Sequence, residues 1–112
     1  MTTNTNAVLI QGASIAASVT TYYTSPSLTT TRITQMVLAN TDSVAHTVTI
    51  YLTPTVSPAV ITDLVVTVNL AAGQSYVVYQ VNNLVMNPGG SIQAVTDTAS
   101  VITLKASGIL IN

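Results

Sequence analysis

Short stretches in which apolar and polar residues alternate, built almost entirely from Val, Ile, Thr and Tyr, recur along this chain. The clearest spans residues 44–53, where Val48, Ile50 and Leu52 share one side and polar residues and a tyrosine the other. A spacing of two is that of side chains on one face of a β-strand. Strong helix formers are scarce, because Glu is absent and Lys occurs once. The pattern predicts an all-β protein.

Turn-forming residues divide these stretches at intervals of about ten residues. The expected strands cover 18–23, 31–40, 44–53, 61–70, 75–81, 91–96 and 101–111. Only a short polar cluster separates 31–40 from 44–53, so these two are expected to form an antiparallel hairpin. Seven to eight short strands are typical of a single antiparallel β-sandwich, of the jelly-roll or Ig-like kind.

The beginning of the chain differs from the rest. Residues 2–6 are polar, and we expect residues 1–12 to form a flexible N-terminal arm that becomes ordered only when something holds it. Residues 13–112 are then a single β-sandwich domain, long enough to bury an adequate core. The apolar run at residues 7–10 is short and follows no Lys or Arg, so no signal peptide is expected.

Charge is nearly absent. The charged residues are Arg32, Lys105, Asp42, Asp63 and Asp97, whereas about a quarter of the residues in a soluble domain are charged. Two cations cannot neutralise the phosphates of a nucleic-acid footprint, so no nucleic acid is expected as a partner. The mean hydropathy is +0.58, but polar residues interrupt every apolar run before the roughly 18–20 residues of a spanning helix, so no membrane is expected.

Few residues are candidates for chemistry. His46 needs a nucleophile or an orienting carboxylate to act as a general base, and the sequence identifies neither, so we interpret it as a strand-edge residue. The aspartates lie near turns but in no calcium-loop pattern, and Gly89–Gly90 precede a strand rather than a helix. The five tyrosines suit sugar stacking or sheet packing. We therefore expect that the chain is not an enzyme and that it binds no metal and no cofactor.

The edges of a sandwich are normally protected by Lys, Pro or bulges, and this chain has almost no charge with which to protect them. Copies of it also repel one another only weakly. We therefore expect its edges or faces to be paired with other copies, as a homo-oligomer, or with a larger partner.

One strand-and-turn pattern runs through the segments Tyr22–Pro26, Thr30–Thr34, Val37–Leu52, Gly90–Ala94 and Leu104–Gly108. In this pattern the chain resembles small β-sandwich structural proteins of tailed bacteriophage virions. The resemblance implies a capsid decoration, or cement, protein that is bound to the major capsid protein, often around three-fold positions as in a trimer, and needs no cofactor. It also implies a virion location, with assembly in the host cytoplasm.

Two alternatives stay open. The same resemblance allows a small tail, baseplate or fibre component, and a carbohydrate-binding β-sandwich for host attachment is the alternative of another class. For a virion protein we expect the arm to pair along a capsid subunit and the charged residues flanking the 31–40 strand to give specificity. The expected partner-contact residues are Thr2, Asn4, Val8, Ile10, Arg32 and Asp42.

Overall fold

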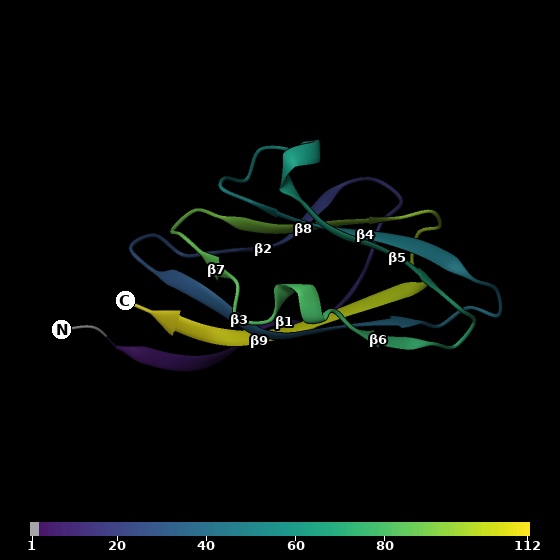
Figure 1. Ribbon diagram of the computed structural model, residues 1–112, viewed down its shortest axis with the longest axis horizontal. Coiled ribbons are helices and arrows are strands. Elements are labelled where there is room, and N and C mark those ends of the chain that lie inside the picture. The colour runs from purple at the N-terminus through teal and green to yellow at the C-terminus, as the bar shows by residue number, and fades with distance from the viewer. Residues whose placement is uncertain (1–2) are drawn as a thin grey trace.

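The computed structural model describes residues 3–112, which form two antiparallel sheets packed face to face (Figure 1). Sheet A contains, in spatial order, β1 (Asn4–Ser14), β9 (Ile102–Ile111), β3 (Thr30–Asn40) and β6 (Ser75–Val77), and the short β7 (Val85–Met86) also pairs with β3. Sheet B contains β2 (Thr20–Thr24), β8 (Ser91–Thr96), β4 (His46–Thr53) and β5 (Leu64–Leu70). Two single turns of 3₁₀-helix, η1 (Ile61–Asp63) and η2 (Tyr79–Val81), lie in the connections. The predicted all-β sandwich is confirmed.

The order of the strands is that of a jelly roll. The first four strands alternate between the sheets, and β4 and β5 then pair within sheet B before the chain returns to sheet A. With the short β7 set aside, the orders β1-β9-β3-β6 and β2-β8-β4-β5 give two four-stranded sheets in this double-sheet arrangement. Every strand pair is antiparallel.

The core lies between the two sheets and comes from the alternating positions of the strands. In β3, Ile33, Met36 and Leu38 are fully buried. Ile33 and Met36 both face the core although they are three residues apart, because a bulge at Thr34 inserts one extra residue opposite β9. Each fully buried side chain of this size contributes about 1.5–3 kcal/mol.

The prediction that residues 31–40 and 44–53 form a hairpin is wrong. β3 lies in sheet A and β4 in sheet B, so the residues between them cross from one layer to the other. Asn40 holds this crossing, because its Nδ2 donates to the carbonyl oxygens of Val44 at 2.8 Å and Leu70 at 3.1 Å. Alternation predicts a strand, but it does not say to which sheet the strand belongs.

The expected N-terminal arm is also corrected, because residues 4–14 form β1. This strand pairs with β9 from Asn4 opposite Ile111 to Ser14 opposite Thr103. The expected boundary between residues 12 and 13 therefore falls within a strand. β1 lies at a sheet edge and is exposed at most positions, and its apolar residues 7–10 are consecutive rather than alternating, so alternation does not predict this strand.

The helical segments of the described residues are the single turns η1 and η2, and no helix there is long and apolar enough to cross a membrane.

Candidate functional site

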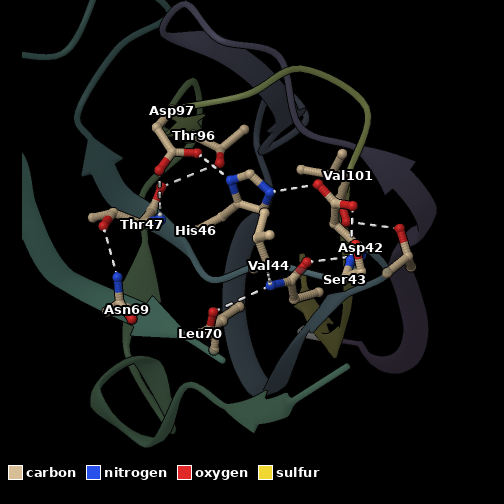
Figure 2. A network of polar contacts seen from close by, with 12 residues as sticks. Asp42, Ser43, Val44, His46, Thr47, Asn69, Leu70, Thr96, Asp97 and Val101 are labelled. Atoms are coloured by element: carbon tan, nitrogen blue, oxygen red, sulfur yellow. Dashed lines mark hydrogen bonds and ion pairs between the residues drawn. The ribbon is translucent and has the colours of Figure 1, made fainter. Parts of the chain in front are cut away.

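His46, the one histidine of the chain, lies between two aspartates at one end of the sandwich (Figure 2). Its Nδ1 is 2.7 Å from Oδ1 of Asp97, and its Nε2 is 2.8 Å from Oδ2 of Asp42. His46 begins β4, Asp42 lies in the crossing from β3, and Asp97 directly follows β8. The jelly-roll crossings thus bring together three residues, the His46 cluster, of which two are 51 positions apart in the sequence.

Both contacts require His46 to carry two ring protons, because a neutral imidazole would direct a lone pair at one carboxylate. The hydrogen bond with Asp42, followed by that with Asp97, raises the pKa of His46 above its ordinary value of 6.5. The hydrogen bond with His46 lowers the pKa of Asp42 below 3.8, and the backbone N–H of Thr47 is the main cause that lowers the pKa of Asp97. Below the raised pKa of His46, the cluster is an imidazolium between two carboxylates.

The His46 cluster connects two loops that cross between the sheets. Asp42 lies in the loop from β3 to β4, where its Oδ1 also accepts the N–H of Ser43 at 2.7 Å. Asp97 lies in the loop from β8 to β9, and its Oδ2 accepts the N–H of Thr47 at 3.1 Å. Charge-assisted hydrogen bonds of this kind are stronger than neutral ones. The cluster therefore fastens this end of the sandwich.

This geometry does not suit His46 to act as a general base. A base needs a ring nitrogen whose lone pair can accept the substrate's proton, and here a carboxylate oxygen lies against each ring nitrogen. Among residues 3–112, no group of three or more His, Cys, Asp or Glu side chains is arranged to hold a metal ion. The arrangement favours a structural role for the cluster.

The outer face of sheet A, directed away from the core, carries both cations of the chain. Arg32 on β3 lies opposite Ile109, and Lys105 on β9 lies opposite Val37. In the part of the chain that the structure describes, ion pairs form only within the His46 cluster, so neither cation has an acidic partner. The Nε of Arg32 is buried without a hydrogen bond. This face therefore displays two positive charges among apolar side chains.

A shallow hollow of about 370 Å³ opens on sheet A near the middle of β9. Its lining residues, from β1, β3 and β9, are Asn6, Ala7, Val8, Thr34, Ser107 and Gly108. A Cβ at Gly108 would lie 2.4 Å from the carbonyl oxygen of Arg32, so only glycine permits β3 and β9 to approach this closely. Val8 is 65% exposed. The hollow offers apolar contact between the positions of the two cations.

β1 is an open edge of sheet A. It pairs with β9 on one side, and no strand of the described residues pairs with its other side. β1 contains no charged residue and no proline, which are common guards of an edge. Register shifts begin after Val8, so residues 4–8 are its regular part. These residues can accept another strand.

The outer face of sheet B is partly covered by the loop of residues 54–60. Gln93 of β8 is 2% exposed and holds this loop. Its Oε1 accepts the N–H of Ala59 at 3.0 Å, and its Nε2 donates to the carbonyl oxygen of Ser57 at 2.8 Å. The loop and the adjoining η1 expose the apolar side chains of Val56, Val60 and Ile61.

The expected contact residues lie in different surroundings. Asn4 and Val8 are exposed on β1 and share sheet A with Arg32. Asp42 belongs instead to the His46 cluster, near the other end of β3 from Arg32. Ile10 is 6% exposed and belongs to the core, because the register shift after Val8 changes the face to which it points.

One more expected contact residue, Thr2, lies outside the described residues.

Sequence reasoning did not find Asp97 as a partner of His46, Gln93 as the anchor of a loop, or Gly108 as a point of close approach. Only the contact of His46 with Asp97 had a signal in the sequence. Asp97 directly follows the predicted strand 91–96, just as Asp42 closely follows the predicted strand 31–40.

The tyrosines do not gather into one exposed cluster. Tyr76 and Tyr79 form a tilted pair with ring centroids 6.5 Å apart, and Tyr79 is exposed. Tyr22 and Tyr23 are half-buried on β2 and pack against the core.

No family model and no curated protein matches the chain. Solved structures of viral particles are similar to it. A crystal structure of the IBDV viral particle has 12% identity and a TM-score of 0.44, covering 98% of this chain and 31% of the other. The infectious bursal disease virus Gx strain has 16% identity and a TM-score of 0.41, covering 99% and 31%. The Gt strain has 14% identity and a TM-score of 0.41, covering 98% and 32%. The chain spans about a third of the length of each.

Proposed function

We propose that this chain is a non-enzymatic structural protein of a bacteriophage virion, which decorates the capsid and is bound to the major capsid protein. The observation that carries the proposal is β1, a strand of 11 residues with one unpaired edge and no charge. In a protein that is free in solution, such an edge invites uncontrolled association. In a permanent assembly the same edge is a binding element.

The proposed contact is strand addition to β1. A strand of the capsid subunit pairs with residues 4–8, and main-chain hydrogen bonds supply most of the affinity. The exposed side chains of Asn4 and Val8 set the register. Because β1 is already paired with β9, its edge is preorganised and little further ordering opposes binding.

Two further observations support this function. Double-sheet jelly rolls occur in viral capsid domains, and also in lectin domains. The segments between Tyr22 and Leu52 resemble small structural proteins of tailed-phage virions. Because one fold serves many functions, the uncharged edge at residues 4–8 weighs more than the fold.

Co-sedimentation with capsids that lack tails tests the proposal. The purified chain should co-sediment with them and raise their resistance to heat or chelators. Thr5→Lys places a charge on the exposed edge strand β1, opposite Leu110, and should weaken binding about tenfold or more. The matched control Thr67→Lys adds the same charge at an exposed position of β5, the edge of sheet B, and should bind as the wild type does.

Each other outcome rejects part of the proposal. Binding to isolated tails instead of capsids assigns the chain to the tail or baseplate. Binding to a glycan, with a change in tyrosine fluorescence, assigns it to host attachment. Equal capsid binding by Thr5→Lys and the wild type removes the β1 edge as the contact.

A further inference from the structure

We infer that copies of this chain bind head to tail: the loop knob of one copy, residues 54–63, docks on the outer face of sheet A of the next copy. The inference extends the proposed virion role, on which it rests for its biological setting. The contact itself is independent of any capsid and is measured on the purified chain.

The loop knob is an exposed apolar surface that is held rigidly. Ile61, the first residue of η1, is 77% exposed, and Val56 and Val60 are also exposed. Two hydrogen bonds with the Gln93 side chain, one accepted and one donated, fix the loop to sheet B. Within η1, Oδ2 of Asp63 accepts the N–H of Val60 at 3.0 Å. A preordered apolar surface loses little conformational entropy on binding.

The receiving surface has complementary features. The hollow near Gly108 has Val8 in its lining, and Arg32 and Lys105 lie on the same outer face, on either side of Ser107 along β9. An apolar side chain such as Ile61 fits the hollow, and a carboxylate beside it meets a cation. Charges arranged in this way set orientation and register.

Charge complementarity identifies a second copy as the occupant. Asp63 is the one aspartate outside the His46 cluster, and no ion pair of the described residues involves it, Arg32 or Lys105. The other two acidic residues, Asp42 and Asp97, are already paired with His46. The chain therefore holds one unpaired acidic residue beside an apolar knob, and two unpaired basic residues beside an apolar hollow.

The two surfaces cannot meet within one molecule. The knob lies over sheet B, on the far side of the core from sheet A (Figure 1). The hollow is lined by residues of β1, β3 and β9 in sheet A. A contact between two different surfaces forms a closed ring, such as a trimer, when the rotation closes, and a filament when it does not.

Sedimentation velocity over a range of concentrations tests the inference. The wild type should associate, and salt should weaken the association because an ion pair contributes. Ile61→Ser should weaken it about tenfold or more. The control Leu28→Ser removes a side chain that is 89% exposed at the turn between β2 and β3, and should leave association unchanged.

Charge reversal tests the pairing itself. Asp63→Lys should weaken association, and so should Lys105→Glu. The side chain of Lys105 is exposed, so its replacement is expected to leave the fold intact. Combining Asp63→Lys with Lys105→Glu and Arg32→Glu should restore association. The knob is then basic and the outer face of sheet A is acidic, so the interface again joins opposite charges. Thermal melts confirm that each variant is folded.

A wild type that stays monomeric at every concentration overturns the inference, as does association that Ile61→Ser and the charge reversals leave unchanged. Association lost only in Thr5→Lys places the contact between copies at the β1 edge instead. Capsid co-sedimentation of the same variants separates the two proposals, because a monomeric chain that still binds capsids rejects only the head-to-tail contact.

Discussion

The two regions that hold most of this chain's charges are built in opposite ways. The first region is the end of the sandwich that holds the His46 cluster, residues 41–47 and 97–101, here called the loop end. There the ring nitrogens of His46 lie 2.7 Å from a carboxylate oxygen of Asp97 and 2.8 Å from one of Asp42, so these charges are paired. On the outer face of sheet A, Arg32 and Lys105 have no acidic partner among the described residues.

This difference separates two uses of charge in a chain that has very little of it. The paired charges fasten two loops that cross between the sheets, and this supports the fold. The unpaired cations contribute no ion pair to the fold and remain available to a partner. Variants of these charged residues should therefore affect stability at the loop end and association on sheet A.

Gly108 is the position on sheet A at which a substitution should disturb the fold most, because an added Cβ would collide with β3. Gly108→Ala places a Cβ 2.4 Å from the carbonyl oxygen of Arg32, which forces β3 and β9 apart. We expect a loss of about 1–3 kcal/mol in the free energy of unfolding, the usual cost of overpacking. Urea unfolding measures it, and the neighbouring exposed Ser107→Ala should change stability by less than about 0.5 kcal/mol.

The loop end should make stability depend on pH. Because folding raises the pKa of His46, its contribution is complete below pH 6.5 and is lost as the pH rises through the folded value. Folding lowers the pKa of Asp42 and Asp97, so their contribution is complete above pH 3.8 and is lost as the pH falls through the folded values. The cluster should stabilise the chain fully between pH 3.8 and 6.5.

His46→Gln tests this dependence in thermal melts from pH 6 to 9. The wild-type melting temperature should fall across the range, because the chain has one His and no Cys to titrate there. The variant's melting temperature should be lower at pH 6 and almost constant. Asp63→Asn, outside the cluster, should keep the wild-type slope. An equal slope in His46→Gln would show that the cluster does not stabilise the fold.

Gln93 should have a smaller effect that is confined to the loop knob. Gln93→Leu keeps a side chain of similar size but removes the hydrogen bonds to Ala59 and Ser57, with an expected cost of about 1 kcal/mol. The Ala59 amide should then exchange faster with deuterium. Thr49→Val removes a hydrogen bond to Thr67 on the same sheet and should leave that exchange rate unchanged.

Lys105 should matter least for stability. Lys105→Gln removes an exposed charge without an acidic partner, so the free energy of unfolding should change by less than about 0.5 kcal/mol. A chemical unfolding curve measures it. A larger loss would mean that this charge serves the fold, and the contrast with the loop end would disappear.

The sequence predicted those features that depend on local pattern. The strands at 31–40, 44–53 and 91–96 were found because one face of each packs against the core. The pairing of 31–40 with 44–53 was wrong, because the layer to which a strand belongs depends on contacts such as those of Asn40 with distant carbonyls. β1 was missed because its pairing with β9 joins opposite ends of the chain.

The site was less predictable than the fold for the same reason. His46 and Asp97 meet only after two crossings between sheets, and no spacing in the sequence records that contact. The positions of Arg32 and Lys105 on one face follow from the register between β3 and β9, which the bulge at Thr34 shifts by one residue. Val8 and Arg32, by contrast, are predicted from the sequence as contact residues, although the sequence does not show that they share a sheet.

The central claim is that the outer face of sheet A is a binding surface. Hydrogen exchange of the dilute chain, compared with that of the assembled form, tests it. We predict new protection at residues 4–14, 54–63 and 103–111, and none at the loop end, 41–47 and 97–101. Protection gained at the loop end, with none on sheet A, would contradict the account.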